Sequence, residues 1–198
     1  MYKKSKLLMC LAIVVAAALL TGCAGMMTKP TEKNFKAAVI SLDHAEVAYY
    51  TGYYYFSNKV KPTKGKAGNY GAPMQMAFVF DIQNPNEYPI MLDGFQFTVL
   101  FEDFQVNTVS SMETMWIPPG KTNQLRVPAM FDTRQTLLTL LLPGAMKLKE
   151  KKISPWDALE KWWTNAPDFS FPVSVTEGSA ILKADGVVKV VPFKATFP

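Results

Sequence analysis

Large apolar side chains recur at every second position along residues 74–102, and this alternation is the clearest structural signal in the chain. A period of two is typical of a β-strand with one buried face. The sequence Asn-Pro-Asn-Glu-Tyr-Pro at 84–89 separates two such runs and predicts a turn that joins two long strands as a hairpin. A lone hairpin is marginal in water, so other strands must cover its apolar face. That face comprises Met74, Met76, Phe78, Phe80 and Ile82 in the first run, and Phe95, Phe97, Val99 and Phe101 in the second.

Further strands are predicted on both sides of this pair. They are expected at 35–50, 104–117, 125–131 and 169–175, and as a C-terminal hairpin over 180–197. The first of them changes phase near Asp43, as a β-bulge would produce. Pro128 cannot donate a ladder hydrogen bond, so its strand is expected at a sheet edge or at a bulge.

Two short helices are predicted late in the chain. Asp132 is a suitable N-cap for an apolar helix over 133–142, and Ser154-Pro155 opens a second helix with serine at the N-cap and proline at the first helical position. The lysine-rich stretch 147–152 is interpreted as a link between them. Seven or eight short strands with two late helices predict an all-β fold, an antiparallel β-sandwich of the immunoglobulin or fibronectin type III shape.

The first 22 residues have the organisation of an export signal. Lys3, Lys4 and Lys6 precede an apolar run over 7–19, which is shorter than the roughly 20 residues that a spanning helix needs. The sequence Leu-Thr-Gly-Cys that follows resembles the lipobox of bacterial lipoproteins, and the resemblance implies cleavage before Cys23 and acylation of that residue. The alternative is an ordinary signal peptide with an incidental cysteine.

Cleavage would change the charge and the cysteine count of the chain. Residues 1–22 carry three lysines and no acid, so the net charge would fall from +5 to +2, which does not support a nucleic-acid footprint. Cys10 would leave with the signal and Cys23 would be acylated, so no intramolecular disulfide is expected. We therefore expect a signal peptide at 1–22, a lipidated tether at 23–34 and one domain at 35–198.

A candidate binding surface combines aromatic residues with lysines. Its members are Tyr53, Tyr54, Tyr55, Lys59, Lys61, Lys64, Lys66, Trp156 and Trp163. Aromatic rings beside lysines suit an anionic, partly apolar partner, such as lipid headgroups or an envelope protein. The alternative is that the tyrosines cover the sandwich, the lysines keep a loop soluble, and Trp156 and Trp163, together with Leu159 on one helical face, close one end of the core.

Catalytic chemistry finds little support in the sequence. His44 is the only histidine, and it is interpreted as a surface or edge residue. We find no nucleotide-binding loop and no metal-ligand spacing, so no cofactor and no enzymatic activity are expected.

One family resemblance joins several of these features. The segments that carry it are Asp81-Ile82-Gln83-Asn84-Pro85-Asn86, Pro89-Ile90, the strand beginning Gly94-Phe95, and Ile117-Pro118-Pro119-Gly120-Lys121 ahead of Val127. Together they resemble the WHy domain of type 2 late embryogenesis abundant proteins, over residues 35–131 and more weakly from 169 onward. Pro85 holds Asn84 extended, and the amides of Asn84 and Asn86 are expected to cap the turn.

The WHy resemblance implies a folded, non-catalytic β-sandwich linked to desiccation and stress tolerance. With the lipobox it predicts a membrane-anchored binding or scaffolding module of the cell envelope. In a cell with two membranes the outer one is expected, because Ala24 follows the cysteine where an aspartate would resemble a signal for retention in the inner membrane. The alternative is a lipid or small-ligand carrier, or an enzyme, with a pocket between sandwich and helices.

Overall fold

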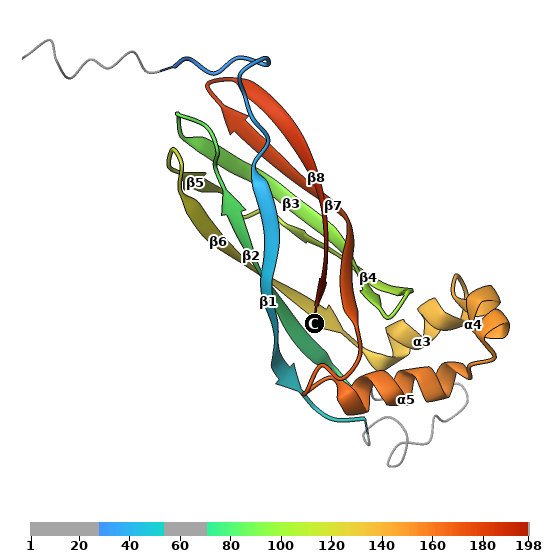
Figure 1. The fold of residues 1–198 in the computed structure, drawn as a ribbon. Helices are drawn as coiled ribbons and strands as arrows, with labels where there is room; N and C mark the ends of the chain where they lie inside the picture. Colours follow the sequence, from blue (N-terminus) through green and yellow to red (C-terminus); the bar gives the residue numbers. More distant parts are fainter. Residues whose placement is uncertain (1–27, 54–70, 198) are drawn as a thin grey trace, which may run out of the picture.

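A computed structural model describes residues 28–53 and 71–197 (Figure 1). Within these residues there are eight strands and three helices. In chain order they are β1 (Val39–Tyr50), β2 (Met74–Gln83), β3 (Ile90–Phe101), β4 (Phe104–Ser111), β5 (Met115–Ile117), β6 (Thr122–Phe131), α3 (Thr133–Leu141), α4 (Ala145–Lys151), α5 (Pro155–Asn165), β7 (Val173–Ala184) and β8 (Val187–Phe197).

The strands form two antiparallel sheets that face each other. One sheet has the order β1-β2-β6, and the other has the order β4-β3-β7-β8 with the short β5 also paired to β3. The predicted antiparallel β-sandwich with late helices is therefore confirmed. The number of helices was wrong, because the lysine-rich stretch expected to be a link forms α4.

The predicted hairpin over residues 74–102 is also wrong in its pairing. β2 pairs with β1 and β6, whereas β3 pairs with β4, β5 and β7, so the connection between β2 and β3 crosses from one sheet to the other. The two apolar faces consequently cover each other. Across the interior, the rings of Phe78 and Phe97 lie 5.4 Å apart and those of Phe80 and Phe95 lie 4.9 Å apart, distances typical of favourable aromatic pairs.

The buried side chain of Asn84 explains why the chain crosses between sheets at this point. Its Nδ2 donates to the carbonyls of Tyr88 at 2.8 Å, Ile117 at 3.0 Å and Pro118 at 3.2 Å. These carbonyls belong to the β2–β3 crossover and to the turn between β5 and β6, so one amide joins two loops. The backbone N–H of Asn84 also donates to the carbonyl of Lys121, while Pro85 has no N–H to continue the ladder.

Asn86 extends this network to the start of the domain. Its Oδ1 accepts from the backbone N–H of Lys36 at 2.8 Å, and its Nδ2 donates to the Lys36 carbonyl at 3.0 Å, in the pattern of a strand ladder. The Oδ1 of Asn84 accepts from both the backbone and the side chain of Asn86 at 2.9 Å. The network therefore fixes the chain just before β1 against the crossover.

Two local irregularities match the sequence pattern. The pairing of β1 with β2 shifts register between Leu42 and His44, which confirms the bulge expected near Asp43. Pro128 lies in β6, an edge strand, opposite Ala77 of β2. The edge position suits a proline because it has no N–H to donate to a neighbouring strand.

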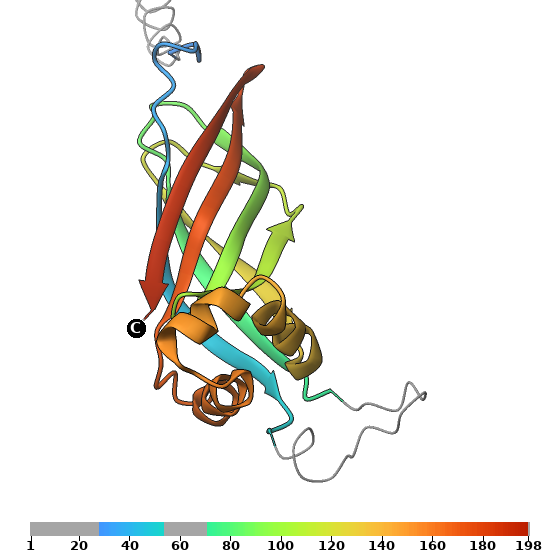
Figure 2. The ribbon, with the colours of Figure 1, turned by 90° about the vertical axis from the view of Figure 1, so that its right-hand side faces the viewer.

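The three helices cover one end of the sandwich, and residues 28–34 lie at the opposite end (Figures 1 and 2). Trp162 and Trp163 of α5 are completely buried there. The Nε1 of Trp163 donates to the carbonyl of Ala72 at 2.8 Å, and the hydroxyl of Tyr50 donates to the carbonyl of Trp163 at 2.5 Å. Helix α5 is thus bonded to the end of β1 and to the chain entering β2.

We expect Asn84→Asp to destabilise the domain by about 3 kcal/mol at neutral pH. The carboxylate keeps the size of the side chain but replaces its donor with an oxygen that faces three carbonyls, and unpaired buried groups cost about 1–3 kcal/mol each. Urea unfolding at pH 7 measures the effect. Asn86→Asp is the matched control, with an expected loss of about 1–2 kcal/mol because its acceptor bond from Lys36 survives. An unchanged midpoint for Asn84→Asp would contradict a structural role of this amide.

Candidate binding site at the helix-capped end

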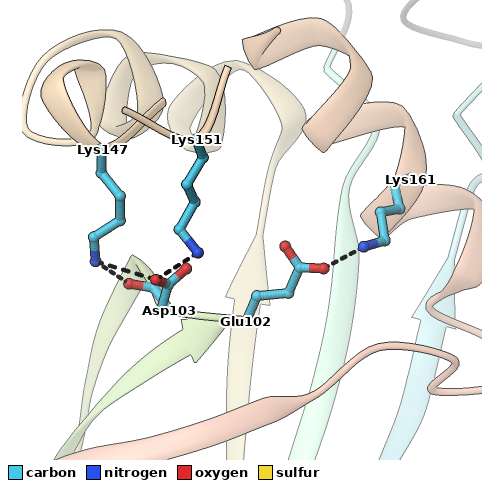
Figure 3. Close-up of polar contacts among 5 residues, drawn as sticks. All are labelled: Glu102, Asp103, Lys147, Lys151 and Lys161. Atoms are coloured by element: carbon cyan, nitrogen blue, oxygen red, sulfur yellow. Dashed lines mark hydrogen bonds and ion pairs between the residues drawn. The ribbon is translucent and has the colours of Figure 1, made fainter. Parts of the chain in front are cut away.

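An ion-pair cluster connects the turn between β3 and β4 to the helices (Figure 3). Asp103 lies in this turn, and its Oδ2 is 2.9 Å from the Nζ of Lys151 and 3.9 Å from that of Lys147. Lys147 also donates to the backbone carbonyl of Asp103 at 2.6 Å. Next to Asp103, Glu102 pairs with Lys161 of α5. One turn therefore holds both α4 and α5 in place.

The charges of the cluster shift the titration of two of its members. Burial of Asp103 opposes ionisation, but the hydrogen bond from Lys151 and the positive charges of Lys147 and Lys151 outweigh it, so the pKa of Asp103 is lowered. The hydrogen bond to Asp103 is also the main reason that the pKa of Lys151 is raised. Both shifts favour the charged forms of the pair at neutral pH.

A cleft of about 370 Å³ lies between the α3–α4 region and strands β3, β4 and β7. Its polar lining includes Asp103, Gln105, Lys147 and Glu177. Glu177 lies in a bulge of β7 with a positive φ of 50°, and its Oε2 accepts from the hydroxyl of Thr98 at 3.2 Å. Lys147 and Glu177 are thus engaged with neighbouring protein groups, whereas the Oδ1 of Asp103 is buried without a hydrogen-bond partner.

An exposed apolar corner lies where α3 meets α4. We define it by four side chains, Leu138, Leu141, Leu142 and Met146, whose exposed fractions are 58%, 46%, 73% and 85%. On the opposite side of α3, Thr133 and Thr136 are buried. The inner side of α3 therefore combines two threonines with Leu140, and Leu137 also packs against the core, whereas Leu138 and Leu141 face outward.

Hydrogen bonds at the start of α3 explain this unusual orientation. The hydroxyl of Thr133 accepts from the backbone N–H of Ala72 at 3.0 Å, inside the protein. Asp132 caps the helix by accepting from the backbone N–H of Arg134 at 2.9 Å. Because Thr133 must face Ala72, only Leu140 among the later leucines becomes fully buried.

The predicted surface residues are only partly within the described residues. Tyr54, Tyr55, Lys59, Lys61, Lys64 and Lys66 lie outside them, as does the lipidation candidate Cys23. Tyr53 is half-buried beside α5, and its pKa is raised by burial and by the charges of Glu160 and Asp157. Tyr53 thus belongs to the packing of the helix-capped end.

The assignment of Trp163 to a binding surface was wrong. Trp163 is fully buried and hydrogen-bonded, while Trp156 remains 50% exposed. The buried face of α5 comprises Ala158, Leu159, Trp162 and Trp163, so Trp156 does not share it as the spacing had suggested. The alternative that the tryptophans close one end of the core is correct for Trp163, and Trp162 is fully buried beside it.

His44 and the acidic residues provide no metal site within the part of the chain that the structure describes. The Nδ1 of His44 lies 2.8 Å from the Oδ2 of Asp43 on the exposed face of β1. No group of three or more His, Cys, Asp or Glu side chains in residues 28–53 and 71–197 is arranged to hold a metal ion. Within the same residues, no helix has the length and apolar character needed to cross a bilayer.

A second depression, with a mainly apolar lining, occupies the other end of the sandwich. It has a volume of about 460 Å³ and is lined by Pro30, Tyr88, Pro89 and Trp116, with Trp116 59% exposed. Lys29 and Asp185 lie 3.8 Å apart at its rim. The sequence does not single out Trp116, because its strand, β5, has only three residues and so shows no clear periodicity.

The apolar corner was also missed, although the sequence contains a signal for it. Residues 137–142 read Leu-Leu-Thr-Leu-Leu-Leu, so the short helix is apolar on more than one side. A helix that packs on one layer can bury only one stripe, and some of these leucines must face water. The sequence alone does not show which ones.

Comparison with known proteins identifies neither a family nor a function. Neither a scan against protein-family models nor a search of curated proteins finds a match. Two solved structures are similar in outline: a crystal structure of a protein from Archaeoglobus fulgidus (12% identity, 79% of this chain and 94% of that chain, TM-score 0.41), and an X-ray structure of a Northeast Structural Genomics Consortium target (11% identity, 82% and 88%, TM-score 0.43).

We expect Asp103→Asn to lower the thermal midpoint by about 1–3 °C at pH 7, as for an exposed ion pair worth at most about 1 kcal/mol. A carboxylate with a lowered pKa stabilises the fold above its unfolded-state pKa, and this contribution is lost as the pH falls through its folded-state value. The difference in thermal midpoint between wild type and variant should therefore disappear below about pH 4. Lys151→Gln should lower the midpoint similarly at pH 7. A gap of equal size at pH 3 would contradict the electrostatic origin.

Proposed function

We propose that this chain is a lipid-anchored, non-catalytic binding module of the cell envelope. Acyl chains on Cys23 hold it to a membrane, the outer one where there are two, and the helix-capped end presents its binding surface. The WHy resemblance of the sandwich connects this role with envelope or desiccation stress tolerance. The observation that carries the proposal is the apolar corner formed by Leu138, Leu141, Leu142 and Met146.

The corner supports binding because exposing it to water is costly. A stably folded chain gains free energy by turning leucines inward, at about 25 cal/mol per Å² of buried apolar surface. Here Leu138, Leu142 and Met146 are each more than half exposed, while the buried side of α3 is shared by Thr133, Thr136 and a single fully buried leucine, Leu140. Contiguous exposed apolar groups on a soluble domain commonly mark an interaction site.

The position of the corner also supports the proposal. Figures 1 and 2 place α3 and α4 at the end of the sandwich farthest from residues 28–34, where the tether enters. The Asp103 pairs with Lys147 and Lys151 hold α4 against the sandwich. A module anchored at one end thus presents an ordered apolar surface at the other.

The alternative, a carrier or enzyme with a pocket between sandwich and helices, has weaker support. A cleft does lie in that position, but most of its charged groups are engaged: Lys147 donates to the carbonyl of Asp103 and Glu177 accepts from Thr98, while the Oδ1 of Asp103 is buried without a hydrogen-bond partner. The interior between the sheets is filled by aromatic side chains such as Phe78, Phe80 and Phe97. A carrier would need a substantial enclosed apolar cavity for its cargo.

A photoreactive amino acid placed at Leu138 tests this function in native membranes. We expect irradiation to produce covalent adducts with a protein or a lipid, since the corner should be covered in the cell. The matched control is the same substitution at Val190, on β8, which is 60% exposed compared with 58% for Leu138. Far fewer adducts are expected there.

The anchor is tested in the same cells. Cys23→Ser should release the protein from the membrane fraction, whereas Cys10→Ser, a change in the predicted signal, should leave an acylated mature N-terminus detectable by mass spectrometry. Adduct yields that do not differ between positions 138 and 190, or an unacylated wild-type N-terminus, would contradict the proposal.

A further inference from the structure

The corner is surrounded by positive charge. Helix α4 and the residue after it, Ala145–Lys152, carry four lysines and one glutamate, and Arg134 lies exposed on α3. Lys147 and Lys151 are partly neutralised by Asp103, whereas the exposed Lys149 and Lys152 lie outside the Asp103 pairs. The partner of the apolar corner must therefore accept leucines and cations together.

The composition of the corner favours a bilayer surface over a protein. Protein interfaces are depleted in lysine, and their strongest contacts are made by tryptophan, tyrosine and arginine, with leucine under-represented. Three of the four side chains of the corner are leucines, and they lie beside a lysine-rich helix. Long lysine side chains can lie along apolar surface while their amines reach anionic headgroups, as in helices that bind at the membrane interface.

We propose that the apolar corner inserts into the interface of the anionic bilayer that holds the Cys23 anchor. This inference rests on the proposed function, and it names the surface that the helix-capped end binds. Leu138, Leu141, Leu142 and Met146 enter the boundary between headgroups and acyl chains, and Lys149 and Lys152 contact anionic headgroups.

The length of the tether permits this arrangement. Four residues separate Cys23 from Thr28, the first described position, so the two Cα atoms are at most about 18 Å apart. The tether end of the domain therefore stays near the bilayer. A strand of 12 residues is about 40 Å long, so a domain that lies along the surface brings its helical end to the same membrane.

Anchoring makes a small insertion sufficient. Four side chains alone would bind a bilayer weakly and reversibly. Once acyl chains hold the domain, the second contact becomes intramolecular, and its effective concentration reaches the millimolar range for a short tether. The corner then sets the orientation of the domain without needing high affinity of its own.

The test uses the full-length acylated protein, reconstituted into vesicles, with an environment-sensitive NBD fluorophore on a single introduced cysteine. Acylated Cys23 does not react with the label and no other cysteine follows it, so Leu142→Cys gives one labelled position. In vesicles of equal parts phosphatidylcholine and phosphatidylglycerol, we expect blue-shifted emission and quenching by spin-labelled lipids. Val190→Cys is the control and should report an aqueous environment.

Two further changes separate charge from apolar contact. In the labelled protein, Lys149→Gln with Lys152→Gln should lower the equilibrium constant for insertion by about fivefold per lysine. High salt, or vesicles of pure phosphatidylcholine, should lower it as well. Leu138→Gln with Leu141→Gln should abolish the blue shift while leaving the thermal midpoint unchanged, because both side chains are already exposed.

The outcomes distinguish this inference from the proposed function. An NBD group at position 142 that stays aqueous in every vesicle, while the protein floats with the lipid, would overturn bilayer insertion and leave the anchored module intact. Protein adducts at Leu138 in cells combined with an aqueous probe would assign the corner to a protein partner instead. Failure of the acylated protein to float with vesicles would overturn the anchor, and both proposals with it.

Discussion

The amide of Asn84 is the interaction on which the arrangement of this sandwich most depends. It is fully buried, and it bonds the β2–β3 crossover to the turn between β5 and β6. Through Asn86 the same network holds Lys36, just before β1. A buried amide without partners would be costly, so this region is stable only when all three segments come together. The crossover sends β3 to the second sheet and allows the faces of β2 and β3 to form one core.

The opposite end of the domain is built from different interactions. There Trp162 and Trp163 fill the space beneath α5, and the Trp163 indole and the Tyr50 hydroxyl bond the helix to the sandwich. The pairs of Glu102 and Asp103 with lysines add weaker, salt-sensitive links from one turn to α4 and α5. Because Thr133 faces inward to Ala72, Leu138, Leu141 and Leu142 point away from the core and stay exposed. The exposed corner is thus a consequence of how α3 is held.

The sequence predicts the elements of this fold better than their partners. Alternation in 74–102 identifies which side chains of β2 and β3 are buried, but a period of two does not tell whether adjacent strands pair with each other or face each other. That choice depends on Asn84 and on the turn after β5, which is about 30 residues away and cannot be seen in local pattern. The caps at Asp132 and Ser154 were correct because capping is local.

The binding site was less predictable for the same reason. Helical spacing placed Trp156 and Trp163 on one face, yet the contacts with Ala72 and Tyr50 turn α5 so that Trp163 is buried and Trp156 is not. Six of the nine residues proposed as a surface lie outside the described residues, so that part of the hypothesis stays a prediction. The corner of α3 and α4 depends on the contact between Thr133 and Ala72, which are far apart in the sequence, so local pattern does not reveal it.

We propose that the helix-capped end is an ordered surface that is covered when the protein is held at a membrane. Hydrogen exchange of the acylated protein, compared between native membranes and detergent solution with the acyl chains bound in both, tests it most directly. We expect slower exchange in membranes over residues 137–147, and unchanged exchange over residues 74–101 in the core. Equal exchange of 137–147 in the two environments, or a slowing confined to the tether end, would contradict it.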